Sequence, residues 1–186
     1  PVDEFTTVNQ WSTVTAADGT NNPHDAIIIG NKAYISLYNA SSDSENLDAA
    51  GHPGDVIVMN LDTGEIEENI SFFDFLNADG DVNDFADQMV LVGTDLYVCL
   101  QDLQSDFSHN AAGKIGVIDT VTNTVTDVIE LQGRNPVDIV ASDDEGTLFV
   151  ALQAPYDFAL GNFDTSNAFG GLEIIPLDDP DNTTLL

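Results

Sequence analysis

Histidine and aspartate side chains are the groups in this chain best suited to bind a cation or to move a proton. The chain has three histidines, His24, His52 and His109, and Asp25 directly follows the first in "NNPHDAIIIG". Imidazole binds transition metals and also serves as an acid or a base. A transition-metal site built from the three histidines is therefore one hypothesis, and ordinary surface histidines are the favoured alternative.

A second candidate is an oxygen-rich stretch, "NADGDVNDFADQ". It places Asp79, Asp81 and Asn83 at alternate positions and Asp87 four residues further on. Carboxylate and amide oxygens at such intervals resemble the ligand pattern of an EF-hand loop, although the central glycine and the final glutamate of that pattern are missing. The sequence therefore predicts a Ca²⁺ site here, with a solvated acidic loop as the alternative.

The overall charge limits the partners of this protein. Its 186 residues carry 33 acidic and 3 basic side chains, a formal net charge of −30. Such a surface repels nucleic acid and anionic membranes, and no apolar run is long enough to cross a bilayer. Calcium binding and adaptation to a saline or marine habitat would both explain the acidity. The start, Pro-Val-Asp, lacks a signal peptide and suggests a mature or excised segment.

Internal repetition is the strongest feature of the sequence. Three segments align, each with two apolar runs around a turn: "PHDAIIIGNKAYISLY" from Pro23, "FADQMVLVGTDLYVCLQ" from Phe85 and "PVDIVASDDEGTLFVALQ" from Pro136. In this alignment Tyr34, Tyr97 and Phe149 fall in register. A second pair of apolar runs follows each segment, in "GDVIVMNLDTGEIEENISF", "GKIGVIDTVTNTVTDVIEL" and, more weakly, "GGLEIIPLDDPDNTTLL". Each unit therefore predicts four antiparallel strands.

Repeated four-stranded units are typical of a β-propeller, an all-β fold built from blades. We expect one propeller domain with an incomplete ring. Its expected parts are one or two strands of a preceding blade (1–22), a blade with a long connection between its second and third strands (23–84), a second blade (85–135) and a third whose outer strand is incomplete (136–186). Further blades or another chain would have to close the ring.

The repeats also resemble a known family. "NPVDIVASDDEGTLFVALQ" and "GKIGVIDTVTNTVTDVIEL" are similar to the YVTN/YncE-type surface propeller repeat, and the resemblance covers residues 23–186. It implies a propeller fold and a secreted or cell-surface location. Members and relatives include binding modules, cell-surface proteins and lactonase-like or copper enzymes. The long connections within the blades depart from the family pattern.

Propeller geometry would place the opening motif beside the central channel. His24 and Asp25 begin an innermost strand, and the alignment gives Asp87 and Asp138 the position of Asp25 in the next two blades. An arc of carboxylates at the channel mouth is expected. These aspartates either accept backbone hydrogen bonds between blades, which is the favoured role, or bind a cation.

The connections between second and third strands should lie on the same face as that channel mouth. They are longer than most loops, and long loops on a rigid scaffold often carry binding function. The residues expected to contact a ligand there are His52, His109, Tyr156, Phe158 and Phe163. Cys99 aligns with Ser36 and Ala151 and is expected to fill a small packing position.

These observations favour an extracellular binding or structural module, stabilised by calcium, that contacts a protein, glycan or small molecule on the long-loop face. No catalytic motif is recognisable. The alternatives are a metal-dependent propeller enzyme, lactonase-like or copper-containing, with its site at the channel mouth, and a component of a larger assembly. Calcium is favoured over a transition metal.

Overall fold

The computed structural model describes most of the repeated region of the chain. The described residues are 9–13, 22–38, 54–76, 82–83, 85–101, 103–104, 112–153, 156–157, 162–163 and 170–186. Every regular element in these ranges is a β-strand, and none of them contains a helix able to span a membrane. In the region 1–22, the described residues 9–13 form no strand.

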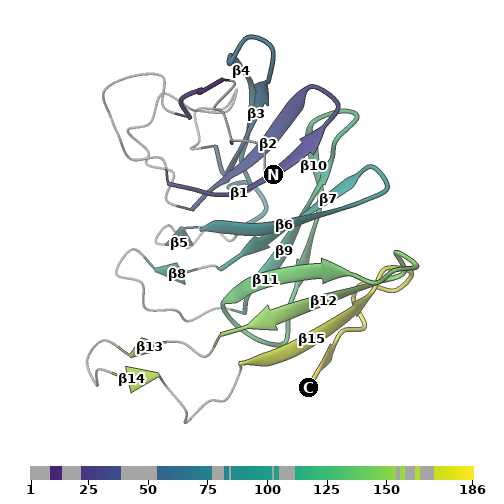
Figure 1. Ribbon diagram of the computed structural model, residues 1–186. Helices are drawn as coiled ribbons and strands as arrows, with labels where there is room; N and C mark the ends of the chain where they lie inside the picture. The colour runs from purple at the N-terminus through teal and green to yellow at the C-terminus, as the bar shows by residue number, and fades with distance from the viewer. Residues whose placement is uncertain are drawn as a thin grey trace, which may run out of the picture.

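The strands form three four-stranded antiparallel sheets, as the repeats predict (Figure 1). The first sheet contains β1 (Pro23–Ile29), β2 (Lys32–Leu37), β3 (Val56–Asn60) and β4 (Ile66–Ile70). The second contains β6 (Ala86–Val92), β7 (Asp95–Leu100), β9 (Lys114–Asp119) and β10 (Thr124–Glu130). The third contains β11 (Pro136–Ala141), β12 (Thr147–Leu152), β15 (Gly171–Pro176) and β16 (Thr184–Leu185).

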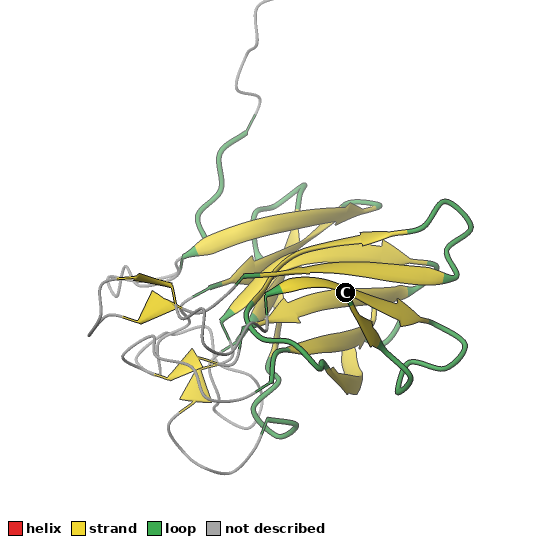
Figure 2. Ribbon diagram, turned by 90° about the horizontal axis from the view of Figure 1, so that it is seen from below, coloured by secondary structure: helices red, strands yellow, loops and turns green. Residues whose placement is uncertain are grey.

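The sheets are arranged like the blades of a propeller. Strands β1, β6 and β11 are the first strands of their sheets, and they pack side by side. Two short pairs lie beyond the sheets, at the end of the molecule where these inner strands begin (Figures 1 and 2). They are β5 (Val82–Asn83) with β8 (Leu103–Gln104), and β13 (Tyr156–Asp157) with β14 (Asn162–Phe163). They fall within or beside the long connections and were not expected.

The hydrophobic core fills the seams between neighbouring sheets. In the first seam, Tyr34 and Val58 of the first sheet pack with Leu96 and Val98 of the second. In the second seam, Tyr97 packs with residues of the third sheet, including Leu148 and Val150. Alternate side chains on a strand point to opposite faces, so each sheet uses one face for each neighbour. Burial between blades explains why both faces of the middle sheet are apolar.

Strand pairing fixes which residues are equivalent in the three sheets. The inner hairpins begin with the pairs Pro23–Leu37, Ala86–Leu100 and Pro136–Leu152. Tyr34, Tyr97 and Phe149 are equivalent, as predicted, because they pair with Ile27, Val90 and Val140 at the same distance from the first pair of each hairpin. Each hairpin has a register shift directly after its first pair, and such bulges redirect side chains.

Candidate polar site at the start of the inner strands

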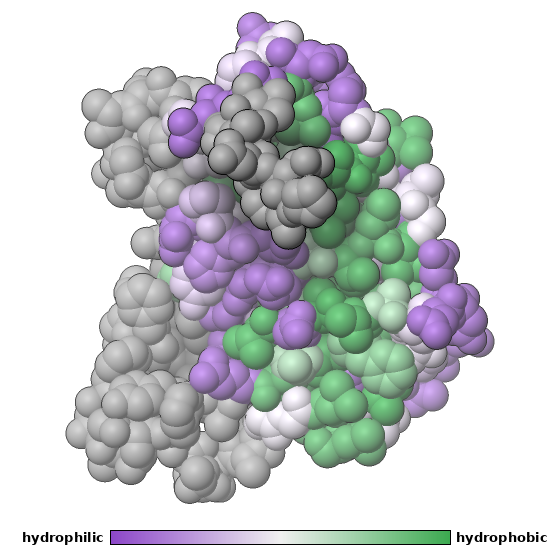
Figure 3. Space-filling model, in the orientation of Figure 1, coloured by the Kyte–Doolittle hydropathy of each residue, from purple (hydrophilic) through white to green (hydrophobic). Residues whose placement is uncertain are grey.

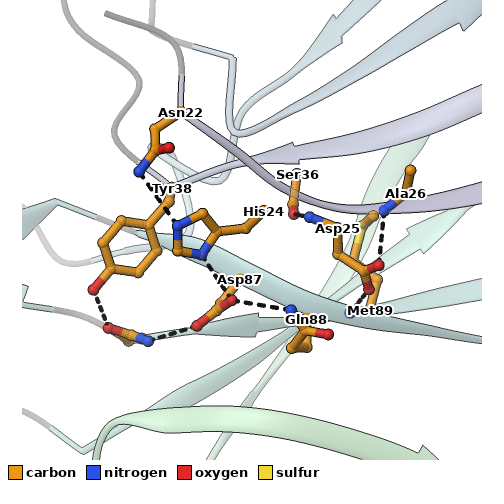
Figure 4. Close-up of polar contacts among 10 residues, drawn as sticks. Asn22, His24, Asp25, Ala26, Ser36, Tyr38, Asp87, Gln88 and Met89 are labelled. Atoms are coloured by element: carbon orange, nitrogen blue, oxygen red, sulfur yellow. Dashed lines mark hydrogen bonds and ion pairs between the residues drawn. The ribbon is translucent and has the colours of Figure 1, made fainter.

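A hydrogen-bonded network joins the first and second sheets where their inner strands begin (Figure 4). His24 Nδ1 lies 3.0 Å from Asp87 Oδ1. Gln101 Nε2 donates to Asp87 Oδ2 at 2.8 Å, and the Tyr38 hydroxyl donates to Gln101 Oε1 at 2.6 Å. The His24 ring stacks on the Tyr38 ring with centroids 4.2 Å apart and an interplanar angle of 11°. The four side chains therefore form one connected network across the seam between the first and second sheets.

The network fixes the protonation pattern of His24. An ionised carboxylate only accepts hydrogen bonds, so His24 Nδ1 must carry the proton that it shares with Asp87. In the neutral ring Nε2 then keeps its lone pair, and it accepts a hydrogen bond from Asn22 Nδ2 at 3.3 Å. The side chain of His24 is 32% exposed, whereas Asp87 is buried. The one basic nitrogen of the network therefore lies at the surface.

Burial also affects the tyrosine of this network. The pKa of Tyr38 is raised, first because burial disfavours its charged form and then because Asp87 lies near. Tyr38 therefore stays a neutral hydroxyl that donates to Gln101. Its ring also contacts Phe85 at 5.0 Å, and Phe85 is buried with a positive φ of 45°. Tyr38 therefore connects the polar network to a buried aromatic side chain.

The repeat explains how the four residues meet, and it corrects the expected alignment. Because the pairs Pro23–Leu37 and Ala86–Leu100 are equivalent, Asp87 occupies the position of His24. The expectation that Asp87 occupies the position of Asp25 was wrong, since Gln88 stands there. It was correct for Asp138. The sequence alignment matched the two Asp residues and was therefore one residue out of register in the second unit.

Asp25 makes the backbone contacts expected of a structural residue. Its Oδ1 accepts from the Ala26 amide at 2.7 Å, and its Oδ2 accepts from the Met89 amide of the second sheet at 2.8 Å. It thereby joins two sheets. Asp138 accepts from the Ile139 amide of its own strand at 2.9 Å.

The three aspartates lie around the buried thiol of Cys99. Burial is the main cause that raises the Cys99 pKa well above its ordinary value, and Asp87, Asp138 and Asp25 add to the effect. Cys99 therefore fills the small packing position that the sequence predicted and is a poor nucleophile. Within the described part of the chain, no three His, Cys, Asp or Glu side chains are placed to hold a metal ion.

Several predicted site residues fall where their side chains are not described. His52, His109, Asp79, Asp81 and Phe158 lie outside the described residues. Asn83 lies on β5, Tyr156 on β13 and Phe163 on β14, and only their backbone is described. The sequence missed Tyr38 and Gln101. The signal that could have found them is their shared place, directly after the second strand of each hairpin.

The surface around the network is polar, in contrast to the rest of the inner strands. Figure 3 shows hydrophilic residues where these strands begin and hydrophobic residues along their remaining length. Ile28 and Val140, for example, are more than half exposed, at 57% and 53%. Polar chemistry on the described part of the inner strands is therefore concentrated at one end.

Comparisons with known proteins add little to this geometry. No family model and no curated protein matches the sequence. Among solved structures, the designed protein Ika8 is 9% identical over 88% of this chain and 35% of its own, with a TM-score of 0.44. A complex of KlAtg21 with the coiled coil of AgAtg16 is 14% identical over 89% and 41%, with a TM-score of 0.46. Hydrazine synthase from Kuenenia stuttgartiensis is 13% identical over 96% and 53%, with a TM-score of 0.39. This chain thus spans between about a third and a half of the length of these three similar chains.

Proposed function

We propose that this protein is a secreted or cell-surface β-propeller module that binds a glycan, a small molecule or another protein at the end where its inner strands begin. The observation that carries the proposal is the His24–Asp87–Gln101–Tyr38 network. It holds the exposed His24 ring in a fixed orientation, and its Nε2 accepts from the exposed Asn22 amide, which a ligand donor can replace. Such preorganised polar groups fix the orientation of a ligand at little entropic cost.

The state of the other groups favours binding over catalysis. Both oxygens of Asp87 accept hydrogen bonds from protein donors, so this carboxylate is not available as a general base. The thiol of Cys99 is buried with a raised pKa. A ligand that donates to His24 Nε2 would replace the exposed Asn22 amide, which bonds this nitrogen in the free protein.

Arrays of glycans and peptides, probed with the labelled protein, test the proposal. The variant His24→Ala removes the exposed nitrogen, and Glu68→Gln on the outer strand of the first sheet is the control because it changes charge far along that sheet from β1. We expect a ligand class whose signal is lost in His24→Ala and kept in Glu68→Gln. Binding that His24→Ala leaves unchanged would contradict the proposed site.

Calcium remains part of the proposal through Asp79, Asp81 and Asn83. The fourth predicted ligand, Asp87, already accepts hydrogen bonds from His24 and Gln101 with its two oxygens. Binding of a cation to the folded state alone raises the melting temperature. We expect the midpoint of thermal unfolding to be higher with calcium than with chelator at the same ionic strength, and equal midpoints would remove calcium from the account.

The enzyme alternative makes a different prediction about metal content. A copper- or zinc-dependent enzyme with its site at the channel mouth would hold a stoichiometric metal that His24→Ala releases. The binding module requires no such metal. Metal analysis of the purified wild-type protein and of the variant separates the two functions.

Among the described residues, no further sheet covers the face of the third sheet that points away from the second, and this supports a second role as part of a larger ring. At equivalent positions, Tyr34 is 1% and Tyr97 8% exposed, because each is covered by the next sheet, whereas Phe149 is only partly buried. Val140 is 53% exposed, although its equivalents Ile27 and Val90 pack against a core. The occupant that fits is a further blade with aliphatic residues where the second sheet has Leu96 and Val98. We expect Val140 to be buried when a further blade, from a longer chain or from another chain, packs on this face. Slower hydrogen exchange of the β11 amides would report that burial.

A further inference from the structure

A hollow of about 310 Å³ lies between the second and third sheets, at the end of the molecule opposite the His24 network. The second sheet lines it with the carboxylates of Asp95 and Asp127 and with the Tyr97 side chain. Leu177 and Pro180, in the turn between β15 and β16, form an apolar wall. Its volume lies at the lower end of the range for small-molecule sites.

The equivalent place in the first seam is closed. There the Tyr34 hydroxyl lies 2.6 Å from Asn123 Oδ1 and 3.1 Å from the Thr120 carbonyl oxygen, both in the turn between β9 and β10 of the next sheet. The corresponding turn of the third sheet offers Leu177 and Pro180 instead. Tyr97 as a residue is 8% exposed, and among the described residues no protein group bonds its hydroxyl, which opens into the hollow. This hydroxyl therefore has its hydrogen-bonding capacity available to a ligand or to water.

The charges at the two seams also differ. Asp95 occupies the position that Lys32 has in the first sheet, since each begins the second strand of its hairpin and pairs with the last residue of the first strand. The Lys32 ammonium lies 2.9 Å from Glu67 Oε2 and so supplies a cation to the first seam. Among the described residues, no basic side chain lines the second hollow. The pKa of Tyr97 is raised, mainly by burial and then by the negative charges of Asp95 and Asp127. Both carboxylates therefore act on its hydroxyl.

We propose that this hollow binds a small organic ammonium compound with an apolar substituent. The two carboxylates would neutralise the ammonium, the Tyr97 ring would supply a cation–π contact, and the apolar wall would cover the substituent. A hard metal ion fits less well, because such ions need six or more oxygen ligands. In this account the ligand supplies the positive charge that Lys32 supplies in the first seam.

Choline is a suitable probe, and 3,3-dimethylbutan-1-ol is its neutral counterpart of nearly the same shape. Each is titrated into the ¹⁵N-labelled protein at about 0.15 M salt, where charges further apart than about 8 Å are screened. We expect choline, and not the alcohol, to shift the amide signals of residues 126–129 and 177–181. Equal shifts by both compounds, or shifts by choline spread over the acidic surface, would overturn the proposal.

Two variants and a matched control test the role of the carboxylates. Asp95→Asn and Asp127→Asn should each weaken choline binding at least about fivefold, the loss expected for one ion pair of about 1 kcal/mol. Glu68→Gln is the control because Glu68 pairs with Val58 as Asp127 pairs with Val117, so it removes one charge from the equivalent place in the first sheet. Equal weakening by Glu68→Gln would show a general charge effect and overturn the site. Calcium displacing choline in a one-to-one titration would also overturn it.

Discussion

The two equivalent tyrosines, Tyr34 and Tyr97, allow a direct test of how the seams differ. Replacing each with phenylalanine removes the same hydroxyl from the same place in a sheet. Tyr34→Phe deletes a donor and leaves the acceptors Asn123 Oδ1 and Thr120 O with one partner fewer. Tyr97→Phe deletes a hydroxyl that has no hydrogen-bond partner among the described residues.

The magnitudes follow from these contacts. A lost hydrogen bond with its acceptor left in a partly buried seam costs about 1–2 kcal/mol, so Tyr34→Phe should lower the free energy of unfolding by that amount. The Tyr97 hydroxyl opens into the hollow and bonds no described residue, so its removal leaves no described protein group unpaired. Tyr97→Phe should therefore change the free energy of unfolding by less than about 0.5 kcal/mol.

Urea denaturation of the wild-type protein and both variants measures the difference. The midpoint should move for Tyr34→Phe and stay nearly constant for Tyr97→Phe, with equal slopes. Equal destabilisation by the two variants would mean that the Tyr97 hydroxyl has a protein partner as strong as those of Tyr34. It would contradict the difference between the two seams. A larger loss for Tyr97→Phe would refute it as well.

Three further predictions concern the inner strands and the seams. Asp25→Ala should lower the free energy of unfolding by about 1–3 kcal/mol, because two backbone amides lose their acceptor. Asp138→Ala should lower it by less, because only one backbone amide is known to lose its acceptor there. Urea denaturation of both variants measures the difference. Gly116→Ala should cost about 1–3 kcal/mol in the same assay, because the added methyl group would overlap the buried Phe72 ring. The thiol pKa of Cys99 is raised in the folded state, so stability should fall as pH rises above about 8.5, by up to about 1.4 kcal/mol per pH unit, and Cys99→Ala should remove that loss. An unchanged pH profile in Cys99→Ala would contradict the cause assigned to it.

The repeat made the fold predictable, and it also explains the one error in the site. Apolar runs separated by turns recur three times, so the three sheets and the equivalence of Tyr34, Tyr97 and Phe149 could be inferred from periodicity alone. The alignment of Asp87 failed because a matching residue type was preferred over the hairpin register, which the turn fixes through Gly30 and Gly93, both with positive φ.

The contacts between sheets could not be inferred from the sequence. His24 meets Asp87 because β1 and β6 pack side by side and both residues lie in the register shift that follows the first pair of each hairpin. The hollow beside Tyr97 depends on what the next turn offers, an asparagine in one seam and a proline in the other. Both features arise from packing between units, whereas repetition in sequence describes each unit alone.

The protonation state of His24 tests the binding-module account most directly. A long-range ¹H–¹⁵N spectrum of the neutral imidazole distinguishes its two nitrogens. We expect a proton on Nδ1, held by Asp87, and a metal-free, unprotonated Nε2 whose resonance is the same before and after treatment with a chelator. A proton on Nε2, or an Nε2 resonance that changes when the chelator is added, would contradict it.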